Sequence, residues 1–182
     1  MVTSMKWRVI FVGVVVTACL AGSFLVGGLL VNKTTASEGN DNVQFVSTVE
    51  EASRIAGYQV VTPAFLPKGL NNHSISVSEP VGDGGLPKRV IQLWSYDGKS
   101  PAIMFVQDPE LDGIGGGEPA KFSGITGMRN LSPATADRPA NLLFYWQDGD
   151  MAYVITSNLT APINEEVLEN IVLSIGGSSQ TS

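Results

Sequence analysis

The pattern of hydrophobic and polar residues divides most of the chain into four segments. Residues 9–31 form an uninterrupted apolar run of 23 residues without a charge. A polar stretch at 32–44 follows and has no apolar period. Residues 45–175 then combine short alternating segments with a helical spacing at either end. The last residues, 176–182, are rich in glycine and serine.

The apolar run predicts a single membrane span, because about 20 apolar residues cross a bilayer core. Lys6 and Arg8 precede the run, so the positive-inside rule places the N-terminus in the cytoplasm. We therefore expect a single-pass protein of the cell membrane with its main domain outside the cytoplasm. The expected segments are a cytoplasmic tail at 1–8, a transmembrane signal anchor at 9–31, a flexible linker at 32–44, an extracytoplasmic domain at 45–175 and a disordered tail at 176–182.

Two alternatives to an uncut anchor stay open. The sequence "VTAC", Val16 to Cys19, resembles a bacterial lipobox, in which the cysteine becomes lipidated. Apolar residues follow Cys19, however, where mature lipoproteins usually continue with polar ones. A cleaved signal peptide would have an apolar core of roughly 7 to 15 residues, which is shorter than this run.

A helix is predicted at each end of the extracytoplasmic domain. In "STVEEASRIAGY", Ser47 with Glu50, or Thr48 with Glu51, forms a capping box, and Gly57 ends the helix. In the closing segment, apolar residues recur every four positions and glutamates crowd the first turns, where they complement the helix dipole. The apolar positions are Ile163, Val167, Ile171 and Ile175.

About six mainly antiparallel strands are predicted between these helices. Asp97-Gly98 and Asp148-Gly149 indicate two-residue hairpin turns. The segment 120–129 is interpreted as one strand interrupted by glycines. The predicted fold class is α+β: a membrane helix and a linker, then a helix, a six-stranded sheet and a helix. The six expected strands are 74–78, 89–96, 102–107, 120–129, 141–147 and 151–157.

Two stretches resemble a bacterial family of unknown function. They are "TVEEASRIAGYQVVTPAFLPKGL" and "LLFYWQDGDMAYVITSNL…INEEVLENIVLSI", which bracket residues 47–175. Members of that family often follow a single membrane helix, and some form the outer part of proposed anti-sigma factors. The resemblance implies a curved half-barrel like that of lipoprotein carriers. Only eight residues precede the apolar run, so sigma-factor binding does not carry over.

Composition argues against several classes of function. The chain has a net charge of −6, and from residue 32 onward 9 bases face 17 acids, so nucleic-acid binding is not expected. Cys19 is the single cysteine and His73 the single histidine. A zinc site or a catalytic triad needs more such side chains. We therefore expect no enzyme, no catalytic residues, no cofactor and no metal.

The loop "DPELDGIGGGE", residues 108–118, partly matches a calcium-binding loop. Asp108, Glu110, Asp112 and Gly113 match the first half of an EF-hand loop, but the twelfth position is Pro119. A strand, rather than a helix, is expected before it. The acids would also repel a phosphate. The preferred interpretation is a mobile loop on which nothing packs.

The last hairpin suggests a binding surface. With a turn at Asp148-Gly149, one face carries Leu142, Phe144 and Trp146 with Met151, Tyr153 and Ile155, and is expected to meet the helices. The other face is smaller but also apolar, and a sheet that is apolar on both sides must cover both or leave a groove. The residues predicted for an apolar groove are Leu143, Tyr145 and Val154. Ordinary core stays open as the alternative.

These observations predict a non-catalytic binding or sensing module of the bacterial cell envelope. Its expected partner is another envelope protein or a cell-wall component. The first alternative is a carrier that holds an acyl chain or a lipoprotein segment in the groove. An envelope hydrolase is the second alternative, for which the sequence offers no clear general base. The sequence does not specify a small-molecule ligand.

Overall fold

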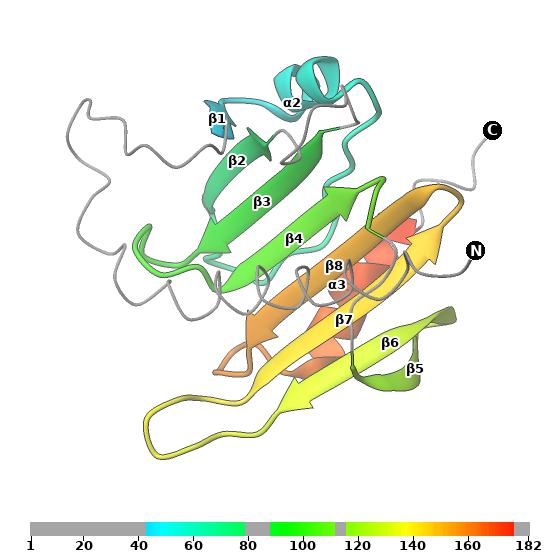
Figure 1. The fold of residues 1–182 in the computed structure, drawn as a ribbon. Helices are drawn as coiled ribbons and strands as arrows, with labels where there is room; N and C mark the ends of the chain where they lie inside the picture. Colours follow the sequence, from blue (N-terminus) through cyan, green and yellow to red (C-terminus); the bar gives the residue numbers. More distant parts are fainter. Residues whose placement is uncertain (1–42, 79–87, 112–115, 177–182) are drawn as a thin grey trace, which may run out of the picture.

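The computed structural model describes residues 43–78, 88–111 and 116–176. These residues form one eight-stranded antiparallel sheet with two helices (Figure 1). The strands are β1 (Val43–Val46), β2 (Asn72–Ser78), β3 (Arg89–Ser95), β4 (Ile103–Asp108), β5 (Glu118–Phe122), β6 (Ile125–Ser132), β7 (Asn141–Asp148) and β8 (Met151–Asn158). The helices are α2 (Val49–Ala56) and α3 (Glu165–Gly176).

The sheet consists of two four-stranded meanders. Its strand order is β1-β2-β3-β4-β8-β7-β6-β5, so each meander runs from one edge toward the middle. The two meanders meet where β4 pairs with β8, with Phe105 opposite Ile155. The edges of the whole sheet are therefore β1 and β5, the first strand of each meander.

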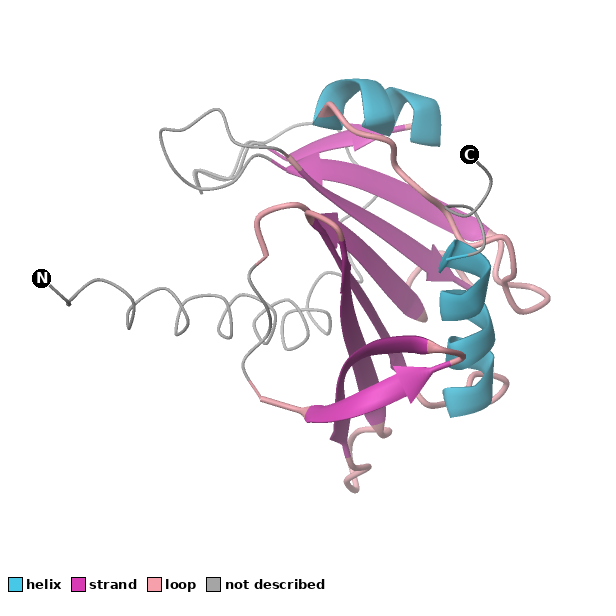
Figure 2. Ribbon diagram, turned by 90° about the vertical axis from the view of Figure 1, so that its right-hand side faces the viewer, coloured by secondary structure: helices cyan, strands magenta, loops and turns pink. Residues whose placement is uncertain are grey.

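Both helices pack on the same face of the sheet, which we call the helix face (Figure 2). Under α3 lies the larger cluster of buried side chains, which includes Trp94, Phe105, Phe144, Trp146 and Ile155. Under α2 lies a smaller cluster of alanine and β-branched side chains, namely Ala52, Ala56, Val60, Ile75, Val77 and Val90. The expectation that the bulky face of the last hairpin meets a helix is confirmed, because Leu168, Ile171 and Ile175 belong to the larger cluster.

Of the two predicted capping boxes, the second, Thr48 with Glu51, begins α2. Thr48 is the N-cap, and its hydroxyl accepts a 3.1 Å hydrogen bond from the backbone N–H of Glu51. The carboxylate of Glu51 accepts in turn from the N–H of Ser47. Gly57 ends the helix with a φ of 82°, as predicted. At the start of α3, the Asn164 side chain accepts from the N–H of Val167.

The predicted fold of helix, six strands and helix is wrong, because the sheet has eight strands. One extra strand is β1, which precedes α2 and includes Val43 and Gln44 of the expected linker. The other arises because 120–129 is a hairpin instead of a single strand. Ser123 and Gly124 both have positive φ (48° and 97°), and Phe122 pairs with Ile125 across them. A two-residue turn of this kind reverses the chain.

The membrane helix of the predicted architecture is not found among the residues that the structure describes. Within the described ranges, neither α2, with 8 residues, nor α3, with 12, is long and apolar enough to cross a membrane. The segment for which the span was predicted, 9–31, lies outside those ranges.

Both predicted hairpin turns differ in register from the structure. In the last hairpin Trp146 pairs with Tyr153 and Asp148 with Met151, so the turn residues are Gly149 and Asp150. The register therefore differs by two residues, and a shift of two leaves every side chain on its predicted face. At the other hairpin, β3 ends at Ser95 and β4 begins at Ile103. The Asp97 carboxylate closes that longer turn by accepting from the N–H groups of Lys99 and Ser100.

The edge formed by β5 and β6 is joined to α3 by Arg129. Its Nη1 is 2.7 Å from Glu118 on β5, and its Nη2 is 2.9 Å from Glu165 at the start of α3. Its Nε also lies 2.9 Å from Glu165 but is not aligned for a hydrogen bond, so that contact is purely ionic. The sheet edge and the helix are thereby held together.

Candidate binding surface

The face of the sheet turned away from α2 and α3, which we call the second face, carries an apolar cluster. Its buried members come from three strands and from the loop after β4: Val106, Leu111, Leu143, Tyr145, Ala152 and Val154. Ile91, Met104 and Met128 are partly buried and pack around them. The cluster therefore spans five strands, β3, β4, β8, β7 and β6.

Strand register places much of this cluster in one row. Ile91 lies opposite Val106, Val106 opposite Val154, Val154 opposite Tyr145, and Tyr145 opposite Met128. Directly opposed residues of antiparallel strands share a face and have adjacent Cβ atoms. The second face thus bears a continuous apolar row across the middle of the sheet.

The three residues predicted for an apolar groove are brought together in this cluster. Leu143, Tyr145 and Val154 retain 8%, 8% and 3% of their exposure. They lie on the second face, opposite to the side chains that pack under α3. In the described part of the chain, the side chain that packs over this face from outside the strands is Leu111.

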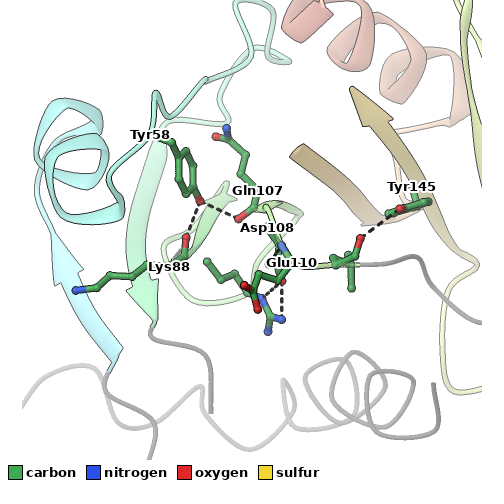
Figure 3. A network of polar contacts seen from close by, with 8 residues as sticks. Tyr58, Lys88, Gln107, Asp108, Glu110 and Tyr145 are labelled. Carbon is green, nitrogen blue, oxygen red and sulfur yellow. Dashed lines mark hydrogen bonds and ion pairs between the residues drawn. The ribbon is translucent and has the colours of Figure 1, made fainter. Parts of the chain in front are cut away.

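Leu111 reaches the second face because Asp108 fixes the loop that follows β4. The Asp108 carboxylate is buried and forms an ion pair with Arg89: its Oδ2 accepts a 2.7 Å hydrogen bond from Nε and lies 2.6 Å from Nη2. Its other oxygen accepts from the N–H of Glu110 at 3.0 Å. The hydroxyl of Tyr145 donates to the Leu111 carbonyl at 3.4 Å. Figure 3 draws this network, with Asp108, Glu110 and Tyr145 labelled.

These contacts change the interpretation of the loop 108–118. The expectation that nothing packs on it is wrong for Leu111, which is 6% exposed. Both oxygens of Asp108, the first proposed calcium ligand, are engaged by protein donors. Asp112 and Gly113 lie outside the described residues. Among the residues that the structure describes, no three metal-binding side chains come together.

On the helix side of the same strand end, Tyr58 connects three elements. Its hydroxyl lies 2.8 Å from the carbonyl of Lys88 and 3.1 Å from that of Gln107, and its single proton is shared between them (Figure 3). Burial, and then the Asp108 carboxylate, raises the pKa of Tyr58 well above its ordinary value. Tyr58 is therefore a neutral donor that ties the segment after α2 to Lys88, the residue before β3, and to β4.

Two buried glutamines anchor the extended segment that follows Tyr58. Gln107 accepts from the N–H of Val61 and donates to the carbonyl of Gln59. Gln92 donates to the carbonyl of Val61 at 2.7 Å. Both glutamines are buried on the helix face, Gln107 at 1% exposure and Gln92 at 0%. Sequence reasoning missed both, although a glutamine at an inward position of an apolar strand is a signal for such a role.

His73 lies on the surface, as predicted, but it has specific partners. Its ring stacks on Trp94 with centroids 4.6 Å apart, and its Nε2 lies 3.1 Å from the Gln92 side-chain oxygen. Burial lowers the pKa of His73, and the contact with Gln92 offsets part of that effect. These contacts support the β2–β3 pair, and no second ionisable partner for His73 is present among the described contacts.

Comparison with known proteins adds no relative. The chain matches no protein-family model, no curated protein and no solved structure. The resemblance to the extracytoplasmic family of unknown function is therefore untested.

Proposed function

We propose that the described domain is a non-catalytic binding module whose second face receives an apolar chain. One observation carries the proposal: both helices of the described part cover the helix face, while a continuous apolar cluster occupies the opposite face. A sheet that is apolar on both faces requires a cover for each. On the second face the cover found in the described residues is a single loop side chain, Leu111.

The composition of the second face also favours an apolar ligand. Its border carries Met104 and Met128, whose flexible thioether side chains adapt to ligands of different shape. The buried Asp108 carboxylate beside the cluster is paired with Arg89 and with the N–H of Glu110. The simplest ligand with matching chemistry is a saturated acyl chain. The extracytoplasmic location expected from the sequence stays a prediction.

The test uses residues 43–176 and a fluorescent long-chain fatty acid. The fragment is first shown to unfold cooperatively, and the fatty acid is then titrated while its emission is followed. We expect saturable binding, which Leu143→Glu abolishes by placing a charge in the apolar cluster. The matched control is Leu131→Glu, which carries the same change at a position 43% exposed on β6.

Two outcomes would overturn the proposal. One is the absence of saturable binding by the folded wild-type fragment. The other is unfolding of the Leu143→Glu fragment at 25 °C, because the second face would then be ordinary core. Circular dichroism of each variant separates the two outcomes. A less disruptive variant, Leu143→Ala, checks the same position and should weaken binding while the fragment stays folded.

A further inference from the structure

The two edges of the sheet differ in chemistry. Strand β5 contains Pro119, which has no N–H to offer a further strand, and the charged residues Glu118 and Lys121. Proline and charge on an edge strand are features that prevent pairing with another chain. Strand β1, with the sequence "VQFV", has neither. Figure 1 shows the two strands at opposite ends of the sheet.

Strand β1 also exposes apolar side chains. Phe45 is 68% exposed and Val43 is 44% exposed. Phe45 pairs with Ser76 and Val43 with Ser78, whereas the neighbouring Ile75 and Val77 pack under α2. Side chains alternate between faces along a strand. Phe45 and Val43 therefore point to the second face.

Phe45 lies at the edge of the sheet in line with the apolar row of the second face, with the polar Ser76 between them. Ser76, its partner on β2, lies opposite Ile91, which begins the row through Val106 and Val154. Within the described ranges, no strand pairs with the outer side of β1. Alternate residues of an edge strand direct their N–H and C=O groups outward. A further strand would therefore pair with the outward N–H and C=O groups of β1.

We propose that β1 pairs with β1 of a second copy of the chain, antiparallel and about a two-fold axis at Gln44. Such an axis is perpendicular to the sheet, so the second faces of both copies lie on the same side. It places Phe45 of each copy opposite Val43 of the other, an aromatic and β-branched pair of the kind that stabilises antiparallel sheets. The two Gln44 side chains lie opposite each other on the other face.

The sequence of β1 is suited to pairing with itself. The strand carries no charge, so the net charge of −6 on each chain is not concentrated at the contact. Two-fold pairing uses the same surface on both copies and closes without forming a filament. A four-residue strand buries less than the roughly 1,200–2,000 Å² of a stable interface. The dimer is therefore weak and depends on concentration.

Disulfide trapping in the full chain tests this pairing. Cys19→Ser removes the native thiol, and Gln44→Cys then places one thiol on the proposed axis. Opposed residues of antiparallel strands have Cα atoms about 4.5–5.5 Å apart, within the range that a disulfide spans. The control is Lys121→Cys in the same background, an exposed position on the β5 edge. Mild oxidation is followed by a non-reducing gel.

We expect a covalent dimer from Gln44→Cys in clear excess over Lys121→Cys. Adding Phe45→Lys should reduce it to the control level, because lysine on an edge strand opposes pairing. Gln44 and Phe45 are both exposed, so these changes leave the fold intact, which circular dichroism verifies. A dimer yield from Gln44→Cys no higher than the control, or one unaffected by Phe45→Lys, overturns the proposal.

Discussion

The side-chain oxygen of Gln107 accepts a 2.9 Å hydrogen bond from the backbone N–H of Val61, 46 residues earlier in the chain. The same side chain donates to the carbonyl of Gln59 at 3.4 Å. The segment that contains Gln59 and Val61 pairs with no strand in the described structure. The Gln107 side chain supplies hydrogen bonds to its backbone that a neighbouring strand would otherwise make. It holds the connection between α2 and β2 against the helix face.

Replacing Gln107 with leucine should destabilise the domain substantially. The change leaves the N–H of the half-buried Val61 without its partner and removes a long hydrogen bond to the carbonyl of the exposed Gln59, so it should cost about 1–3 kcal/mol of unfolding free energy. Urea unfolding measures the difference. Gln147→Leu, at an exposed position on β7, is the matched control and should change stability by less than about 0.5 kcal/mol. Equal costs at the two positions would show that the hydrogen bonds of Gln107 do not matter.

Two leucines of α3 offer a second matched comparison. Leu168 is 1% exposed and belongs to the large cluster under the helix, whereas Leu173 is 49% exposed. Leu168→Ala should cost about 2–5 kcal/mol, because it leaves a cavity in the core. Leu173→Ala should cost less than about 0.5 kcal/mol, since alanine and leucine are both good helix formers. Thermal unfolding of both variants checks this order, and the reverse order would contradict the packing of α3.

Sequence periodicity predicted the parts of the fold that depend on neighbouring residues. The capping box of Thr48 and Glu51 and the apolar stripe of α3 are local patterns. The faces of β7 and β8 were also predicted correctly despite the wrong turn residues. Alternation has a period of two, so the displacement of two residues in pairing left Leu143 and Tyr145 on their expected side.

The two strands that the sequence analysis did not predict, β1 and one strand of the β5–β6 hairpin, have weaker patterns in the sequence. Strand β1 has four residues and follows a polar stretch, so its pattern is too short to distinguish from a linker. In the β5–β6 hairpin, Gly127 was interpreted as an interruption. The glycine is required for close packing, because a Cβ there would lie 2.2 Å from the Tyr145 carbonyl oxygen. Contacts such as Arg89 with Asp108 depend on the strand order, which single-sequence patterns do not contain.

His73 provides a prediction of pH dependence. Burial lowers its pKa below 6.5, so the folded protein resists protonation more than the unfolded chain does. The unfolded chain then binds more protons, and stability falls as the pH falls through 6.5 toward the folded-state pKa. The contribution of His73 is fully present above pH 6.5.

A single ring resonance makes this prediction easy to measure, because the chain has one histidine. NMR titration of the folded fragment 43–176 should give a midpoint below 6.5. In urea, the same fragment should give a value near 6.5. His73→Gln should remove this part of the pH dependence of stability. A folded midpoint at or above 6.5 would mean that contact with Gln92 outweighs burial.

The last prediction concerns Leu111 and rests on the proposed function. Leu111 packs over Leu143, Tyr145 and Val154, so it occupies surface that an apolar ligand would need. Leu111→Ala should tighten binding of the fluorescent fatty acid, while Leu131→Ala, at an exposed site, leaves it unchanged. Removing a competing apolar contact of about 1.5 kcal/mol should lower Kd by about tenfold. Weaker binding by Leu111→Ala would instead identify Leu111 as part of the wall that holds the ligand.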